Sequence, residues 1–397
     1  MTLTFFTNFL EQHKAPFADE LYKLLGDDFK LVENEEMPLS FKNSGYPDFS
    51  NKPYLIKLYE SKTQQNKAIK LYLESDVVIT GGIINEFILE RIEQNKPTFR
   101  YCERIFKDGY YHLLSPKALI NYFKIHTRFR NKNVHVLCAS AYAAFDFSLL
   151  RAYPNKCYKW GYFTKVEEMD IEKVIQRKNK SQITIFWVAR FIDWKHPELP
   201  VKLARNLKSK GYHFHLNMAG SGNQVEKIKS LIHELEVDDC VSLIGNLQND
   251  EIHDMMKQSH VFLVTSDRNE GWGAVLNEAM SNGCAVVASN MIGAAPFLIE
   301  NEKNGFLFMS GDLHSLTQQV ESLLNDEALR VRLSIQAYHT MENVWSPKNA
   351  ADNFIKLSKA ILNGNSCDIK DGPCSKANST KPPKILSYSE TISVKCN

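Results

Sequence analysis

Short apolar runs rich in β-branched residues alternate along the chain with stretches in which apolar residues recur at helical spacing. The runs predict eleven strands, at residues 3–9, 29–34, 54–59, 76–80, 97–102, 134–140, 183–189, 214–220, 241–245, 261–266 and 285–289. Helical patterns such as 197–209, 224–235 and 273–282 lie between them. This alternation predicts parallel sheets that helices cover on both faces.

Eleven strands are too many for one small sheet, so the expected fold class is α/β with two doubly wound, Rossmann-like domains. Such sheets bind ligands at the carboxyl ends of their strands, and we expect the two domains to face each other across a cleft. The polar stretch 164–182 is the expected linker. The expected divisions are a first domain at 1–165, a second at 166–346, a helix returning to the first domain at 347–363 and a disordered tail at 364–397.

The composition is that of an ordinary cytoplasmic protein. Of the 397 residues, 44% are hydrophobic, but no run of about 18 apolar residues predicts a membrane-spanning helix. The first residues lack the features of a secretory signal peptide. The eight cysteines include no C-x-x-C pair, which favours reduced thiols. No nucleic-acid partner is expected.

Two glutamates flank a predicted helix start in the stretch "SDRNEGWGAVLNEAMSN". The backbone amides of Gly273, Ala274 and Val275 begin this helix, and such amides can hold a phosphate. Glu270 and Glu278 would repel a phosphate but can accept hydrogen bonds from the hydroxyls of a sugar. The alternative is that Glu270 interacts with the helix dipole and Glu278 is a solvated helix residue.

Two cations follow the strand predicted at 183–189. Arg190 and Lys195 would stand at the same edge of the sheet, where two positive charges suit a diphosphate. The alternative is that they are ordinary surface charges. The loop "MAGSGNQ" follows the next strand and contains Gly220, which permits a close approach of the backbone.

The combination of "ARFIDWK", "MAGSG", "LIGNL" and "SDRNEGWGAVLNEAMSNGCAVVAS" resembles the donor half of the group-1 retaining glycosyltransferases with the GT-B fold, including their Glu-x7-Glu motif. The N-terminal stretches "FFTNFLEQHKAPFADELYKLLG" and "YCERIFKDGYYHLLSP" are similar to the capsular and lipopolysaccharide enzymes of this group. The resemblance covers residues 1–363.

The resemblance implies a role for each residue of the donor half. Arg190 and Lys195 would hold the donor diphosphate, Glu270 would contact the transferred sugar, and Glu278 would hold the ribose. The residues Gly245, Asn246 and Leu247 would lie near the base.

The same resemblance implies a metal-independent hexosyltransferase that works with retention. It would use a UDP- or GDP-sugar as donor, need no cofactor, and act on a glycan or lipid-linked acceptor in cell-surface polysaccharide biosynthesis. No Asp-x-Asp motif stands in a suitable loop, so no metal is expected. The alternatives are a GT-B epimerase or phosphorylase, or a non-catalytic protein that binds nucleotide sugars.

The acceptor side departs from the family pattern. Many members carry a histidine after the strand that corresponds to 97–102, whereas this chain has Cys102, Glu103 and Arg104. Either Glu103 or Arg104 replaces the missing polar group, or the two pair with each other. His13 is a further acceptor-side candidate, with a structural role as its alternative.

Positive charge is concentrated in the first domain. Residues 1–165 contain 23 Lys and Arg against 18 Asp and Glu, although the whole chain carries only +2. Segment 116–132 sets five of these cations among apolar and aromatic residues. It would rest on an anionic membrane, at the inner membrane face, or pack against the core as a helix whose solvated side is basic.

Overall fold

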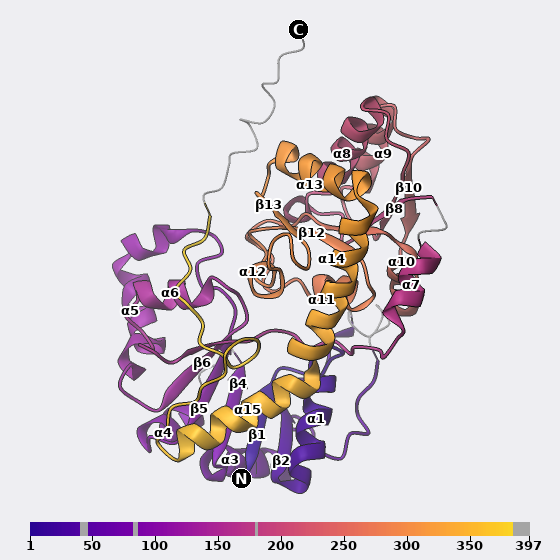
Figure 1. The fold of residues 1–397 in the computed structure, drawn as a ribbon. Helices are drawn as coiled ribbons and strands as arrows, with labels where there is room; N and C mark the ends of the chain where they lie inside the picture. Colours follow the sequence, from indigo (N-terminus) through magenta and orange to yellow (C-terminus); the bar gives the residue numbers. More distant parts are fainter. Residues whose placement is uncertain (40–46, 82–85, 179–181, 384–397) are drawn as a thin grey trace. The chain divides into compact units, whose positions relative to one another are not determined.

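A computed structural model describes residues 1–39, 47–81, 86–178 and 182–383, and Figure 1 shows the course of the chain. The described residues form two compact units. Unit 1 comprises residues 1–165 and 344–381, and unit 2 is built from residues 166–343. Unit 1 therefore consists of two segments that lie far apart in the sequence.

Unit 1 contains a seven-stranded parallel sheet in the order β3-β2-β1-β4-β5-β6-β7. Every residue of β1 and β6 is buried, as expected for apolar strands covered on both faces. The strands are β1 (Leu3–Thr7), β2 (Phe29–Glu33), β3 (Leu55–Lys57), β4 (Val77–Gly81), β5 (Thr98–Cys102), β6 (Val134–Cys138) and β7 (Cys157–Lys159).

Serine residues begin three of the helices of unit 1. The hydroxyls of Ser61, Ser115 and Ser346 accept hydrogen bonds from amides in the first turns of α3, α5 and α15. The helices are α1 (Ala15–Leu25), α3 (Lys62–Glu74), α4 (Glu86–Glu93), α5 (Pro116–Ile125), α6 (Ala143–Leu149) and α15 (Pro347–Leu362), with short 3-10 turns η1 (Gly26–Asp28), η2 (Tyr110–Leu114) and η3 (Thr127–Phe129).

Helix α15 belongs to the core of unit 1, although it comes from the end of the chain. Its Phe354 is fully buried, and its ring centroid lies 4.8 Å from that of Phe99 and 5.8 Å from that of Trp160. Phe17 of α1 approaches the same ring at 6.3 Å. Three segments of unit 1 thus meet on one aromatic side chain of the returning helix.

The expected disorder of 364–397 is wrong for the part of this tail that the structure describes. Lys376 forms an antiparallel bridge with Tyr158 beside β7, and Asp371 pairs with Lys159 at 2.6 Å. Cys374 is only 2% exposed. A polar composition did not reveal these contacts, because they depend on the distant strand β7. Residues 384–397 lie outside the described residues.

Unit 2 contains a six-stranded parallel sheet in the order β10-β9-β8-β11-β12-β13. Its strands are β8 (Thr184–Val188), β9 (His215–Ala219), β10 (Val241–Gly245), β11 (Val261–Val264), β12 (Ala285–Ser289) and β13 (Phe306–Phe308). Its helices are α7 (Ile171–Lys178), α8 (Glu198–Ser209), α9 (Val225–Glu234), α10 (Asn249–Gln258), α11 (Ala274–Ser281), α12 (Ala295–Leu298), α13 (Leu313–Asn325) and α14 (Glu327–His339), with a 3-10 turn η4 (Asp193–Lys195) and a π turn η5 (Thr340–Val344).

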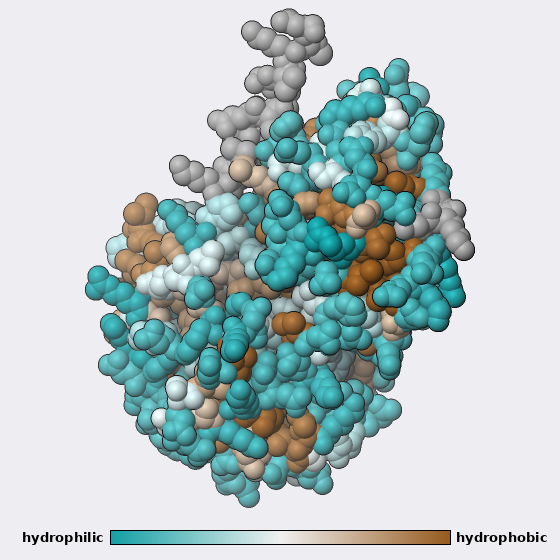
Figure 2. All heavy atoms as spheres, viewed as in Figure 1, coloured by the Kyte–Doolittle hydropathy of each residue, from teal (hydrophilic) through white to brown (hydrophobic). Residues whose placement is uncertain are grey.

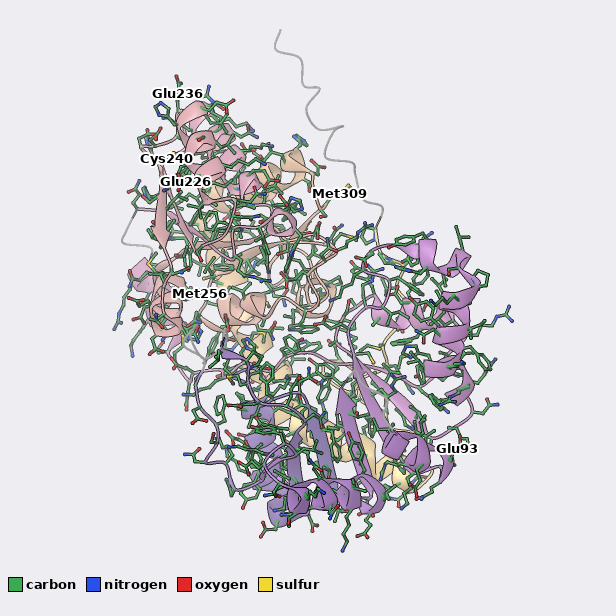
Figure 3. All side chains as sticks on the ribbon, turned by 180° about the vertical axis from the view of Figure 1, so that it is seen from behind. Glu93, Glu226, Glu236, Cys240, Met256 and Met309 are labelled. Carbon is green, nitrogen blue, oxygen red and sulfur yellow. The ribbon has the colours of Figure 1, made fainter. Side chains whose placement is uncertain are left out.

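A buried lysine, Lys178, connects helix α7 to other segments of unit 2. The ammonium group of Lys178 donates to the carbonyl oxygens of Gly283 at 2.7 Å and Met256 at 3.3 Å. The position of Met256 in unit 2 can be seen in Figure 3. Burial lowers the pKa of Lys178. The stretch expected as a polar linker therefore contains a helix anchored to the second unit, while residues 179–181 lie outside the described part.

The α/β class with two doubly wound sheets is confirmed, and all eleven expected strands are present. The two strands that the pattern did not predict, β7 and β13, are three-residue edge strands, too short for a recognisable apolar run. Along the described ranges, no helix is long and apolar enough to cross a membrane.

Candidate functional site

The carboxyl edge of the sheet in unit 2 carries the two expected cations on one aromatic ring. Strand β8 leads directly to Arg190, which is exposed. The guanidinium carbon of Arg190 lies 5.6 Å from the ring centroid of Trp194, and the ammonium nitrogen of Lys195 lies 4.4 Å from the same centroid. The indole thus holds two positive charges near each other at this edge.

The glycine loop after β9 lies directly against the segment that carries Arg190. A Cβ atom on Gly220 would stand 2.0 Å from the carbonyl oxygen of Ala189, and one on Gly222 would stand 2.3 Å from that of Phe191. The amide of Gly220 also donates to the carbonyl oxygen of Gly245 at 2.7 Å. Any side chain at 220 or 222 would push these loops apart.

The loop after β10 leaves backbone accessible beside the glycine loop. Gly245 has a positive φ of 74°, and both Gly245 and Asn246 are exposed. Leu247 is half-buried. The structure therefore brings the loops after β8, β9 and β10 together at one edge.

Helix α11 begins at the same edge, after β11. Gly273 has a φ of 88°, and a Cβ atom there would lie 2.7 Å from a methyl carbon of Ile292. The amides of Ala274 and Val275 belong to the first turn, where a helix offers no internal carbonyl partner. Glycine at 273 thus permits the left-handed turn from which α11 begins.

The two expected carboxylates differ in their surroundings. Glu270 forms an ion pair with Lys195, and their side chains are only 12% and 13% exposed. Glu278 lies half-buried in α11. The pairing of Glu270 with Lys195 joins two residues that the sequence assigned to different parts of a ligand, and it leaves Arg190 as an exposed cation of this edge.

His196 is a residue that the sequence reasoning missed. Its backbone has a positive φ of 50°, and its ring nitrogens lie 3.0 Å from a carboxylate oxygen of Glu198 and 3.4 Å from one of Asp267. Burial alone would lower its pKa, but hydrogen bonds to Asp267 and Glu198 raise the pKa of His196 to about 9. The charged imidazole therefore links the loop after β8 to the loop before Glu270. No spacing in the sequence indicates that these loops meet.

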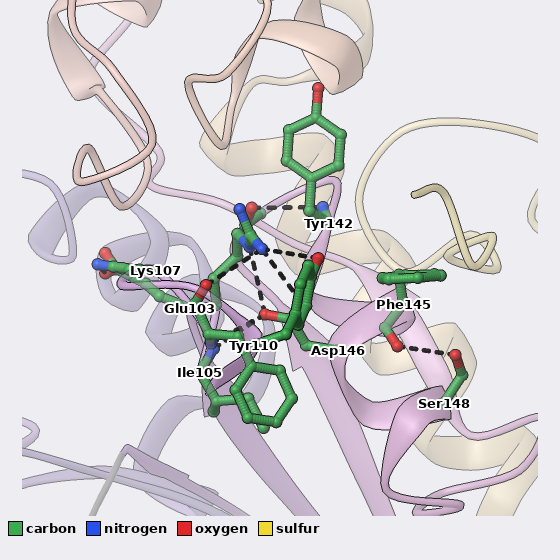
Figure 4. A network of polar contacts seen from close by, with 11 residues as sticks. Glu103, Ile105, Lys107, Tyr110, Tyr142, Phe145, Asp146 and Ser148 are labelled. Carbon is green, nitrogen blue, oxygen red and sulfur yellow. Dashed lines mark hydrogen bonds and ion pairs between the residues drawn. The ribbon is translucent and has the colours of Figure 1, made fainter. Parts of the chain in front are cut away.

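In unit 1, Arg104 lies in a buried ion pair. Its guanidinium contacts Asp146 at 3.2 Å, and Figure 4 shows the network of polar contacts around Asp146. The side chains of Arg104 and Asp146 are 4% and 0% exposed. Asp146 also accepts hydrogen bonds from the amides of Ile105 and Phe106. Burial raises the pKa of Asp146, although Arg104 opposes this shift. The expected alternative in which Arg104 pairs with Glu103 is therefore wrong.

Glu103 and His13 instead meet at Tyr162. The carboxylate of Glu103 contacts the ammonium of Lys107 and accepts a hydrogen bond from the Tyr162 hydroxyl at 2.7 Å. The imidazole of His13 stacks on the Tyr162 ring, with centroids 6.1 Å apart. Two of the three acceptor-side candidates are therefore neighbours, and the third has a buried partner of its own.

The described residues contain no group of three or more His, Cys, Asp and Glu side chains that could hold a metal ion.

Comparisons with known proteins find a family match for most of unit 2. Residues 168–340 match the family described as glycosyl transferases group 1. The chain is 30% identical over 175 residues to poly(glycerol-phosphate) alpha-glucosyltransferase of Bacillus subtilis, covering 44% of this chain and 25% of that protein. It is 31% identical over 169 residues to the amylovoran biosynthesis glycosyltransferase AmsK of Erwinia amylovora, covering 41% of each.

The fold extends the likeness to nearly the whole chain. The crystal structure of Anabaena Alr3699/HepE in complex with UDP superposes with a TM-score of 0.66 at 14% identity, covering 91% of this chain and 100% of that one. The chain spans less than half the length of the two curated relatives named above. The fold is GT-B, and residues 168–340 are a domain of the group 1 glycosyltransferase family.

Proposed function

We propose that this chain is a retaining, metal-independent glycosyltransferase. It transfers a sugar from a nucleotide-diphosphate sugar to a glycan or lipid-linked acceptor in cell-surface polysaccharide biosynthesis. The observation that carries the proposal is the exposed Arg190 beside the side-chain-free loop at Gly220 and the start of α11 at Gly273. The complex of Anabaena Alr3699/HepE with UDP and the polysaccharide role in the name of AmsK support it.

The charges at this edge suit the chemistry of a leaving diphosphate. As the bond between the anomeric carbon and the phosphate oxygen breaks, negative charge grows on the phosphate. Arg190, Lys195 and the first amides of α11 stabilise that charge. Glu270 orients the ammonium of Lys195 and contacts the transferred sugar, and Glu278 accepts hydrogen bonds from the ribose. The leaving phosphate takes the acceptor proton, so no enzymic nucleophile is needed.

A panel of UDP- and GDP-sugars tests this proposal. Incubation with each donor, followed by NMR of the products, should show slow hydrolysis or transfer of one sugar with its anomeric configuration retained. Conversion of the bound donor into its epimer would favour an epimerase. Release of a sugar phosphate when phosphate is added would favour a phosphorylase. Nucleotide-sugar binding with no turnover would favour the non-catalytic alternative.

Arg190→Ala makes the test specific to the site. We expect nucleotide diphosphate affinity to fall by about 1.5–3 kcal/mol in calorimetry, because a charge-assisted contact is lost. Arg205 is an exposed arginine on α8, and Arg205→Ala is the matched control that should bind like the wild type. Equal affinity in both variants would refute the assignment of Arg190.

The second part of the proposal concerns the membrane. No residue of α5 is fully buried, but its Tyr122 packs against the core of unit 1, with its ring centroid 5.4 Å from that of the buried Phe106. The alternative of a core-packed helix therefore holds for one side of α5, and the membrane proposal concerns its exposed side. Large hydrophobic side chains of η2 and α5 are exposed, and Figure 2 shows hydrophobic side chains gathered near the edge where Figure 1 places α5. They are Tyr110 (36%), Tyr111 (59%), Leu114 (85%), Leu119 (41%), Ile120 (57%) and Phe123 (56%).

Cations accompany this apolar surface. Four cations of the segment are exposed: Lys117, Lys124, Arg128 and Arg130. The fifth, Lys132, pairs at 2.7 Å with Glu93, whose position can be seen in Figure 3. An apolar face with a positive margin fits an anionic lipid surface. We therefore propose that segment 116–132 attaches a cytoplasmic protein to the inner membrane face, where a lipid-linked acceptor would be found.

Cosedimentation with phosphatidylserine vesicles tests the attachment. The wild type should bind at low salt and dissociate at high salt, and a Lys124→Gln/Arg128→Gln/Arg130→Gln variant should bind less, since each cation contributes about 1 kcal/mol near the surface. Lys62→Gln/Lys67→Gln/Lys70→Gln removes three exposed charges from α3 of the same unit and is the control. Absence of binding at low salt, or an equal loss in the control, would contradict the proposal.

A further inference from the structure

Unit 1 has its own cavity at the carboxyl edge of its sheet. The cavity has a volume of about 620 Å³, and its walls come from the ends of β1, β4 and β5 and from the end of α5. Its charged lining residues are Lys14, Arg100, Glu103 and Arg104. The balance of these charges decides what the cavity can bind.

Arg100 is a buried cation whose hydrogen-bond partners are all neutral. Its side chain rises from β5, and the residue is only 3% exposed. One guanidinium nitrogen, Nη1, donates to the carbonyl oxygen of Ile125 at 2.7 Å and to the hydroxyl of Tyr153 at 2.6 Å, and it lies 2.9 Å from Nδ1 of His126. Burial and the nearby Arg100 lower the pKa of His126 to about 3, so this imidazole stays neutral at physiological pH.

The other charges of the lining already have ionic partners. Arg104 pairs with Asp146, and Glu103 contacts Lys107. Lys14 lies 3.6 Å from a carboxylate oxygen of Glu11. Among the residues whose side chains the structure describes, no carboxylate lies within ion-pair distance of Arg100. A buried charge without a counter-charge is unfavourable, and an anion that enters the cavity would relieve it.

We propose that this cavity binds an anionic group of the acceptor, a phosphate or a carboxylate, with Arg100 as its counter-ion and Lys14 as a second cation at the lining. The guanidinium nitrogens of Arg100 other than Nη1 make no hydrogen bond to the described residues, and they can donate to two oxygens of one anion. Binding of the anion stands on unit 1 alone. Its identity as the acceptor rests on the proposed function.

Calorimetry in the absence of any donor tests the site. At low salt we expect the wild type to bind sn-glycerol 3-phosphate or L-malate and not to bind glycerol, and the stronger of the two anions identifies the preferred group. Arg100→Gln should weaken this binding roughly tenfold to a hundredfold, and Arg100→Lys should weaken it less. Lys67→Gln, which removes an exposed cation of α3 outside the cavity lining, should bind like the wild type.

Each outcome decides for or against the site. Failure of the wild type to discriminate either anion from glycerol overturns the proposal, and so does unchanged affinity in Arg100→Gln. If Arg100→Gln loses its cooperative thermal melt, Lys14→Gln takes its place, with about threefold weaker binding supporting the site and unchanged affinity overturning it. UDP affinity is measured alongside. Anion binding without any nucleotide binding would support this cavity and contradict the proposed function.

Discussion

The carboxyl edges of the two sheets differ in whether backbone or side chains form their surface. In unit 2 the edge is made mainly of backbone, with glycines at 220, 222 and 273 where a Cβ atom would meet a neighbouring loop or side chain. In unit 1 the edge is made of long polar side chains, such as Arg100 and Arg104, held by partners from distant segments. Under the proposed function, the first edge binds the groups that all donors share. The second presents an individual set of charges, as a site for a particular acceptor would.

The largest expected effect concerns the buried pair of unit 1. Asp146→Ala leaves Arg104 buried without its counter-charge and should lower the free energy of unfolding by about 3–5 kcal/mol in urea. Asp371→Ala breaks an ion pair whose aspartate is 66% exposed, and it should cost less than about 1 kcal/mol. Nucleotide affinity should not change in either variant. Two equally stable variants, with transfer lost only in Asp146→Ala, would instead assign Arg104 to the acceptor.

The next effect concerns the backbone edge of unit 2. Gly220→Ala should lower nucleotide affinity by about 1–3 kcal/mol, because the new methyl group would displace the carbonyl of Ala189 that precedes Arg190. Gly211 also has a positive φ, of 82°, but nothing lies within 4 Å of its added Cβ atom. Gly211→Ala is therefore the control for backbone strain without a clash. If both variants bind equally weakly, strain and not close approach explains the loss.

A smaller effect is expected at the pair of Lys195 and Glu270. Glu270→Ala should spare nucleotide binding and reduce turnover, since Arg190 and the first amides of α11 still hold the diphosphate and the contact with the transferred sugar is lost. The pair is partly buried, so a double-mutant cycle on the free energy of unfolding should give a coupling of about 1–2 kcal/mol. Additive effects of the two substitutions would show that the contact contributes nothing to unit 2.

The smallest effect concerns pH. The pKa of His196 is raised from 6.5 to about 9, so its stabilisation of unit 2 is complete below pH 6.5 and is lost as the pH rises through 9. Between pH 7 and 9 we expect unit 2 to lose on the order of 1 kcal/mol of stability after allowing for solvent screening. His196→Gln should reduce this slope in thermal melts. An unchanged slope would contradict the assigned pKa.

The edge of unit 2 could be predicted better than that of unit 1, because its informative residues are close together in the sequence. The strands, the start of α11 and the glycine positions of unit 2 follow from apolar runs and short loops, in which the informative residues are neighbours in the chain. The partnership of Arg104 with Asp146 joins residues 42 positions apart, and that of Arg100 with Tyr153 joins residues 53 apart. No local pattern indicates such pairs, so the sequence left the interpretation of Glu103 and Arg104 open and did not predict the buried position of Arg100.

The structure of unit 1 also imposes an order on folding during synthesis. Its aromatic residues Phe17, Phe99 and Trp160 pack against Phe354. The ribosome adds Phe354 almost two hundred residues after Trp160, so these three side chains lack their packing partner until then. The residues of the main hydrophobic core of unit 2 all lie within residues 183–333, so this core can be completed before α15 emerges. The part of the protein made first is therefore finished last. Until then its unfilled aromatic core is a surface to which chaperones, or other unfinished chains, can bind.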